Sequence, residues 1–228
     1  MYKGKNKKSS KKKEIFVQDR FNSLLERMVN DQIIIRGVTD LKVLKAIRKV
    51  PRDEFVDEDM KDDAYDDRPL PIGFGQTISQ PYIVALMTEC LGLSGDEKIL
   101  EIGTGSCYQT AILAEIAKEV YSVEIVKPLY ERAKKVLSKY KNIKLSNSDG
   151  YMGWKEFAPY DRIIVTAAPE NIPEPLIEQL KEGGIMVLPS GPSGWSQMLL
   201  KIKKKGGKIT TDRICDVAFV PLTRNHNR

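Results

Sequence analysis

The chain has 228 residues, 41% of them hydrophobic and 30% charged, which indicates one well-packed α/β domain with an extension, or two small domains. The formal net charge of +6 comes from residues 1–13, which hold seven lysines and no acidic residue, so the remainder carries a net charge of −1. This balance argues against a basic body built to bind nucleic acid, and three widely spaced cysteines without a C-x-x-C pattern argue against a disulfide framework or a zinc site.

Residues 1–18 form a lysine-rich tail that has too little apolar content to fold, and we expect a disordered arm there. The arm has two interpretations: a solubilising extension, or a tether to RNA or another anionic surface. The lysines are followed by the charged run EIFVQDRF rather than by an apolar segment, and no apolar run reaches the ~18 residues of a membrane span. The sequence therefore predicts neither a secretory signal nor a membrane anchor, and the cysteine usage favours the cytoplasm.

Residues 19–95 are expected to form an N-terminal extension of helices and a long covering loop. Apolar residues recur at helical spacing over 21–28 and again over 41–50, where Asp40 is a candidate N-cap and Pro51 a stop signal. The stretch 51–80 is rich in Asp, Pro and Gly and is predicted as a loop of about 30 residues, a length that is often functional. A further helix is predicted over 81–92 because proline favours the first helical turn.

Residues 96–228 alternate between strand and helix and are expected to form an α/β core that is continuous with the extension. Strands are predicted over 98–102, 120–125, 143–147, 161–166 and 185–189, and helices over 108–118, 128–140 and 173–181, the last closed by Gly183-Gly184. This rhythm predicts a doubly wound, Rossmann-like parallel sheet. The run 197–222 contains a Gly-Gly turn and predicts a closing antiparallel hairpin, whose place in the strand order the sequence leaves open.

The run KILEIGTGSCYQTAILAEIA (98–117) suggests a ligand-binding loop between a strand and a helix. Gly103 and Gly105 would let the backbone turn tightly beside a ligand, and Glu124 lies 21 residues beyond Gly103, at the end of the next strand. An acid at that spacing can accept both hydroxyls of a ribose, so the pattern favours an adenosine-type ligand. A tight turn with a solvated Glu124 remains the alternative.

The choice of ligand depends on the residues that follow the second glycine. A dinucleotide site requires a third glycine where this chain has Tyr108, whereas S-adenosylmethionine has no phosphate and no such requirement. Asp149, followed by Gly150, could accept from an adenine amino group, or could simply form a turn. Cys107 occupies a position where methyltransferase loops have glycine, and we expect it to adopt a negative φ without strain.

Five runs make the chain similar to the prokaryotic protein-L-isoaspartate (D-aspartate) O-methyltransferase family over about residues 23–223. They are VPRDEFV (50–56), AYDDRPLPIGFGQTISQPYIVALMTE (64–89), ILEIGTGSCYQTAILAE (99–115), DRIIVTAAPENIP (161–173) and FVPLT (219–223). The resemblance implies a class I methyltransferase sandwich that uses S-adenosyl-L-methionine, with S-adenosyl-L-homocysteine as product, to esterify the free α-carboxylate of isoaspartyl and D-aspartyl residues in damaged proteins. The chain departs from the family's pattern at Cys107 and in residues 1–20.

The resemblance also implies site residues, no metal, and a monomer acting on isoaspartyl proteins and peptides. Ser79 matches the active-site serine, and the residues implied beside the cofactor are Thr77, Ile78, Ser79, Gln80, Glu101, Gly103, Thr104, Gly105, Glu124, Asp149, Gly150 and Thr223. From the residues alone, Ser79 could equally be the N-cap of the following helix.

The proposed chemistry fits a chain whose one histidine is His226, near the end. A carboxylate is already ionised at neutral pH, so methyl transfer to it needs alignment and hydrogen-bond donors rather than a general base. A nucleic-acid base methyltransferase is disfavoured because TAAPENIP, after the fourth strand, offers no aromatic ring for stacking. A non-enzymatic binding module, inactivated at Cys107, and an NAD-dependent oxidoreductase are two competing hypotheses.

Overall fold

The computed structural model describes residues 19–192 and 196–224. The predicted disorder of residues 1–18 and the position of His226 lie outside these ranges. Within them, no helix is both long and apolar enough to cross a membrane.

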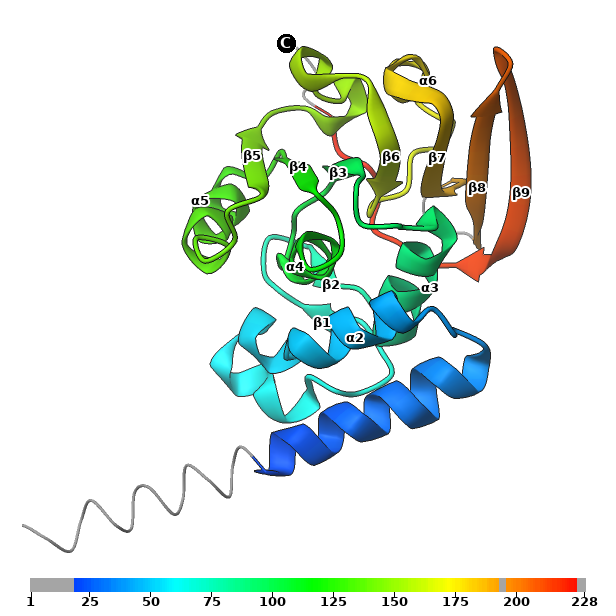
Figure 1. The fold of residues 1–228 in the computed structure, drawn as a ribbon. Helices are drawn as coiled ribbons and strands as arrows, with labels where there is room; N and C mark the ends of the chain where they lie inside the picture. The colour runs from blue at the N-terminus through cyan, green and yellow to red at the C-terminus, as the bar shows by residue number, and fades with distance from the viewer. Residues whose placement is uncertain (1–18, 193–195, 225–228) are drawn as a thin grey trace, which may run out of the picture.

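A seven-stranded sheet organises the molecule, in the order β5-β4-β3-β6-β7-β8-β9 (Figure 1). Its five parallel strands confirm the doubly wound prediction, and they are β3 (Lys98–Ile102), β4 (Glu119–Glu124), β5 (Ile143–Asn147), β6 (Tyr160–Val165) and β7 (Leu180–Ser190). The predicted hairpin consists of β8 (Gln197–Lys205) and β9 (Lys208–Val217), which continue the sheet in antiparallel fashion. Gly206 and Gly207 turn this hairpin with φ of 61° and 69°, a left-handed pair that glycine adopts without steric cost.

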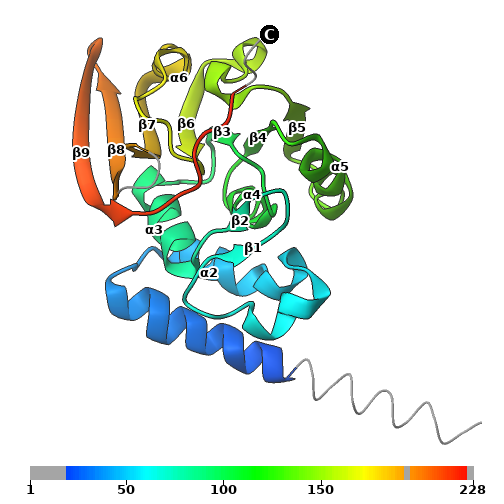
Figure 2. The same ribbon diagram turned by 180° about the vertical axis from the view of Figure 1, so that it is seen from behind.

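Helices cover both faces of the sheet (Figures 1 and 2). On one face, α3 (Pro81–Leu91) and α4 (Tyr108–Ala114) bury apolar residues such as Ile99 and Val120, and α5 (Lys127–Val136) packs beside α4. On the other, α6 (Glu174–Gln179) and the short 3₁₀ turn η6 (Lys155–Phe157) cover Leu100 and Ile163, and a second 3₁₀ turn, η5 (Gly150–Met152), contacts α6. The helices predicted over 81–92, 108–118, 128–140 and 173–181 therefore exist, and each ends earlier than its sequence pattern suggests.

The part of the N-terminal extension that precedes α3 packs on the helical layer rather than on the sheet (Figure 1). A helix over 19–27 continues into a π-helical turn, η1 (Met28–Ile33), and a 3₁₀ turn, η2 (Ile34–Arg36). The next helix, α2 (Leu41–Lys49), is capped as predicted, because the Asp40 side chain accepts hydrogen bonds from the backbone of Lys42 and Val43. One apolar cluster contains residues of this extension together with residues of α4 and α5, which fixes the extension against the core.

The segment 51–80 is more ordered than the predicted loop. It contains two 3₁₀ helices, η3 (Arg52–Phe55) and η4 (Glu58–Asp63), and a small hairpin of β1 (Leu70–Pro71) and β2 (Thr77–Ile78). Arg52 is fully buried, donates to the Ala64 carbonyl at 2.7 Å and stacks on the Tyr108 ring. Burial lowers the pKa of Arg52 to about 10. Periodicity could not show this order, because a buried cation and short turns hold the segment instead of an apolar stripe.

The prediction that Gly183-Gly184 ends a helix at 181 was wrong. The strand β7 begins at Leu180, and the two glycines lie within it. Tyr160 pairs with Leu180 but Arg162 pairs with Ile185, so residues 181–184 bulge out of the ladder. Gly183 has φ of 79°, which a bulge requires and which glycine supplies in strands as well as at helix ends.

Candidate functional site

The carboxyl ends of the parallel strands bring the candidate residues to one edge of the sheet. Gly103 follows β3, Glu124 ends β4, Gly150 follows β5 and Thr166 follows β6. They surround a cavity, here called the loop cavity, that is lined by Gln76, Thr77, Ile102, Gly103, Val123, Glu124, Ile125, Val126, Gly150, Thr166, Ala167, Val220, Pro221, Leu222 and Thr223. The structure thus joins Thr77, Gly103, Glu124, Gly150 and Thr223, which are far apart in the chain.

Gly103 is required by its backbone and by its neighbour. Its φ is 98°, and a Cβ at this position would lie 2.4 Å from the Thr166 hydroxyl oxygen. That hydroxyl donates to the Gly103 carbonyl at 2.7 Å and to the Ile102 carbonyl at 3.0 Å. The close approach tethers the loop to the end of β6.

Glu124 supports the same loop with both of its carboxylate oxygens. One oxygen accepts from the Gly105 backbone N–H at 2.8 Å, and the other accepts from the Val126 N–H at 2.8 Å. The residue is 5% exposed and lines the loop cavity, so it is not the solvated turn residue of the alternative interpretation. Each oxygen has a second lone pair, which leaves it able to accept a hydroxyl as well.

Glu101 and Thr104 lie beneath the loop and do not line the cavity. Glu101 is fully buried, and one of its oxygens accepts from the Thr110 and Ser122 hydroxyls, each at 2.6 Å. The Thr104 and Ser122 hydroxyls are hydrogen-bonded to each other at 2.6 Å. Burial raises the pKa of Glu101 to about 8, so the carboxyl is mostly protonated at neutral pH.

Cys107 contradicts the expectation of a negative φ. The residue is the N-cap of α4 and adopts φ of 76°, in the left-handed region. Burial raises the pKa of its thiol to about 12, so it is protonated at neutral pH. The conformation is one that glycine adopts readily, because the loop must reverse here before α4 begins, and the cysteine accepts the strain.

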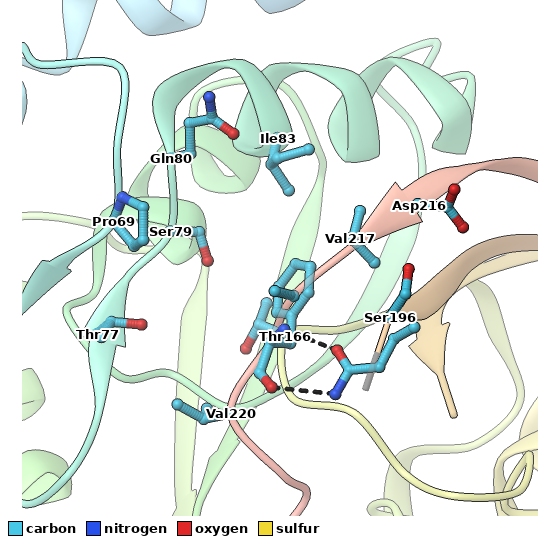
Figure 3. A pocket seen from close by; sticks show the side chains of 13 residues that line it. Pro69, Thr77, Ser79, Gln80, Ile83, Thr166, Ser196, Asp216, Val217 and Val220 are labelled. Atoms are coloured by element: carbon cyan, nitrogen blue, oxygen red, sulfur yellow. Dashed lines mark hydrogen bonds between the residues drawn. The ribbon is translucent and has the colours of Figure 1, made fainter. Parts of the chain in front are cut away.

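A large cleft of about 770 Å³ opens beside the loop cavity (Figure 3). Its lining comes from the β1–β2 segment, α3, the end of β6, the start of β8, the end of β9 and the chain that follows it. The lining residues are Pro69, Thr77, Ser79, Gln80, Ile83, Thr166, Ser196, Gln197, Asp216, Val217, Ala218, Phe219 and Val220. A third, smaller cavity is lined by Ile78, Ser79, Gln109 and neighbouring residues. Thr77 and Thr166 line all three cavities, so they mark the point where the cavities meet.

Ser79 lines two of the cavities and does not cap the helix that follows it. The N-cap of α3 is Gln80, and no side chain makes a capping hydrogen bond there. Ser79 precedes the cap and lines both the large cleft and the small cavity. The Gln80 side chain is held outside the first turn, since its amide donates to the Asp67 carbonyl and carboxylate. The first turn of α3 therefore has backbone N–H groups without side-chain partners beside Ser79.

Asp149 and Gly150 form a tight turn at the rim of the loop cavity. The Asp149 carboxylate accepts from the Tyr151 N–H at 2.9 Å and lies 3.9 Å from Arg224. A Cβ on Gly150 would lie 2.4 Å from an Ile102 methyl, so only glycine fits against β3. The adjoining Thr223 reaches the cavity because the chain after β9 returns across the sheet, where Ala168 forms a bridge with Pro221.

Sequence reasoning missed two features of the site. Thr166 directly follows the fourth parallel strand, so the rule that ligands bind at carboxyl ends could have identified it. The Gln197 side chain exchanges two hydrogen bonds with the backbone of Phe219, at 2.7 and 3.1 Å, and so holds the returning chain at the cleft. No sequence signal indicates this long-range contact.

The parallel sheet, the glycine loop after β3 and the acid at the end of β4 define a Rossmann-like class I methyltransferase. The family model described as Protein-L-isoaspartate(D-aspartate) O-methyltransferase matches residues 22–227, and the chain belongs to this family.

Similar proteins cover most of the chain. It is 58% identical over 188 residues to the protein-L-isoaspartate O-methyltransferase of Dictyoglomus thermophilum, covering 82% of this chain and 85% of that protein. It is 56% identical over 202 residues to that of Dictyoglomus turgidum, covering 88% and 89%. A solved structure of a candidate protein-L-isoaspartate O-methyltransferase from Plasmodium falciparum, in complex with S-adenosyl-L-homocysteine, superposes with a TM-score of 0.77. That pair is 28% identical, and the match covers 90% of this chain and 99% of the other.

Proposed function

We propose that this protein transfers the methyl group of S-adenosylmethionine to the free α-carboxylate of L-isoaspartyl, and D-aspartyl, residues in damaged proteins. The observation that carries the proposal is the meeting of the cavities at Thr77 and Thr166. A carboxylate seated in the large cleft beside Ser79 would reach a methyl donor held at the glycine loop. We therefore call the large cleft the acceptor cleft.

The residues around the loop cavity fit an adenosine-type methyl donor. Glu124 would accept the ribose hydroxyls, and Gly103 and Gly150, which line the same cavity, let the backbone pack closely on Thr166 and Ile102. Asp149, beside Gly150, would contact the adenine, Thr223 would contact the cofactor from the cavity lining, and Glu101 with Thr104 would position the loop from below. The donor supplies a methyl group on a positively charged sulfur, which an anionic oxygen attacks in line.

The acceptor cleft offers neutral hydrogen-bond donors to a carboxylate nucleophile. Of the described residues that line it, the only charged one is Asp216, an acid that cannot pair with a carboxylate, so hydroxyls and backbone N–H groups must hold the substrate. We infer that Ser79 and the first turn of α3 hold the carboxylate, because the positive end of the helix dipole favours an anion. Neutral donors orient the oxygen without the strong pairing that an Arg or Lys would impose, and no general base is needed.

The methyl ester makes the substrate carbonyl electrophilic. The backbone nitrogen of the following residue can then displace methanol to form a succinimide, whose hydrolysis restores part of the normal aspartyl linkage. This stage is intramolecular and requires no group from the protein. We further propose that the enzyme acts as a cytoplasmic monomer on isoaspartyl proteins and peptides.

A pair of peptides that differ only in an isoaspartyl or an aspartyl residue tests the proposal. The purified protein should transfer labelled methyl from S-adenosylmethionine to the isoaspartyl peptide and not to its aspartyl twin. Intact cofactor binding without transfer to the isoaspartyl peptide would contradict the enzymatic function. Ser79→Ala should lower kcat/KM by about tenfold to hundredfold, the loss expected for one hydrogen bond to a charged group.

The ribose role of Glu124 has its own test. Glu124→Gln should weaken the binding of S-adenosylmethionine by about 1–3 kcal/mol, measured by titration calorimetry, because one acceptor oxygen is lost. Glu119→Gln, at the opposite end of β4, is the matched control. An unchanged dissociation constant in the Glu124 variant would remove this residue from the cofactor site.

A further inference from the structure

We propose that Thr166 is a positioning residue with two separable roles: its hydroxyl tethers the glycine loop for the donor, and its methyl group forms the wall between donor and acceptor. The inference rests on the proposed function and deepens it. It assigns a role to a residue that neither the glycine loop nor the segment TISQP (77–81) contains.

The first role follows from the contacts of the hydroxyl. The Thr166 oxygen lies 2.7 Å from the Gly103 carbonyl and 3.0 Å from the Ile102 carbonyl, to which it donates. Its own backbone N–H donates to the same Ile102 carbonyl at 2.9 Å. The loop is thus fixed at its first residue, and the bare α-carbon of Gly103 faces the oxygen closely enough to exclude any Cβ.

The second role follows from the rest of the side chain. Because the hydroxyl is turned toward the two carbonyls, the methyl end of the side chain is left to line the cavities. Thr166 contributes to the loop cavity, the acceptor cleft and the small cavity behind Ser79, and Thr77 does the same from the β1–β2 hairpin. In Figure 3 the two threonines come from different segments, with Ser79 above and Val220 below. Methyl transfer needs the reacting atoms at about 3 Å, so a wall residue here sets their approach.

The two roles predict opposite outcomes for two conservative variants. Thr166→Val keeps the branched shape and loses the hydroxyl, so the dissociation constant for S-adenosylmethionine should rise about tenfold, the loss of roughly one buried hydrogen bond. Thr166→Ser keeps the hydroxyl and loses the methyl group. Its dissociation constant should stay within about twofold of the wild type, while kcat for the isoaspartyl peptide falls about threefold to tenfold from poorer alignment.

Calorimetry with S-adenosylmethionine, steady-state kinetics with the isoaspartyl peptide and thermal unfolding are measured on the full chain and each variant. Thr211→Val, on the exposed part of β9, is the matched control and should behave as the wild type. A dissociation constant for Thr166→Val within about twofold of the wild type would overturn the tether, and unchanged kcat in Thr166→Ser would overturn the wall.

The calorimetric measurement needs no peptide, so it tests the tethering role of the Thr166 hydroxyl even if the wild type fails to methylate the isoaspartyl peptide. That failure would refute the proposed function. A folding defect would instead lower the melting temperature of the Val and Ser variants alike, and would change the dissociation constant and kcat in both variants. Such a common effect contradicts the separation of roles.

Discussion

Replacing Glu101 by glutamine tests the electrostatics beneath the glycine loop. Burial, opposed by the hydrogen bonds from Ser122 and Thr110, raises the pKa of Glu101 from 4.5 to about 8. Since the unfolded chain releases this proton near pH 4.5, the native protein holds a proton between pH 4.5 and 8 that the unfolded chain lacks. Stability contributed by the protonated group is therefore present at low pH and is lost as the pH rises through this window.

The magnitude follows from the width of the window. The free energy of unfolding should fall by about 1.4 kcal/mol per pH unit, or about 5 kcal/mol between the unfolded and folded pKa values. Between pH 5.5 and 8 the expected loss is about 3 kcal/mol. Glu101→Gln mimics the protonated carboxyl, so this part of the pH dependence should disappear in the variant.

Urea unfolding at several pH values from 5.5 to 8.5 measures the effect in both proteins. One buried oxygen of Glu101 has no hydrogen-bond partner, so the amide nitrogen of the glutamine would be buried there without an acceptor. At pH 5.5 the variant should therefore be less stable than the wild type by about 1–2 kcal/mol. The difference should shrink and then reverse as the pH rises. Glu178→Gln, at an exposed position of α6, should keep the wild-type slope. Parallel slopes in the wild type and Glu101→Gln would refute the reasoning.

Three further predictions concern the loop and the cleft. Gly103→Ala should destabilise the protein by about 2–4 kcal/mol in urea unfolding, because its Cβ meets the Thr166 hydroxyl at a φ of 98°; a smaller loss would mean that the loop relaxes freely. At position 107 the φ of 76° should make Cys107→Gly about 1 kcal/mol more stable than Cys107→Ala, and the reverse order would show that the cysteine is not strained. Asp216→Asn should reduce the preference for peptides that have Lys rather than Glu beside the isoaspartyl residue, by up to about fivefold in kcat/KM at low salt. Asp212→Asn is the control, because the Asp212 carboxylate is paired with Lys203.

The sequence by itself determined the order of the elements and much of the donor site. Strand–helix alternation predicts the parallel sheet, and the spacing from Gly103 to Glu124 places both at carboxyl ends, because parallel strands end at one edge. The capping by Asp40 and the Gly-Gly hairpin turn are equally local, since each depends on the chemistry of a few adjacent residues.

Only the tertiary structure decided what depends on contacts between distant segments. The left-handed φ of Cys107 is imposed by the reversal between β3 and α4, and residue type alone predicted the opposite sign. Glu101, expected beside the cofactor, lies under the loop because strand alternation turns it toward Thr110 and Ser122. The order in segment 51–80 depends on the burial of Arg52, and the position of Thr166 depends on the fold bringing it and Thr77 together where three cavities meet. A local pattern carries none of these facts, because each is set by which segments the fold brings together.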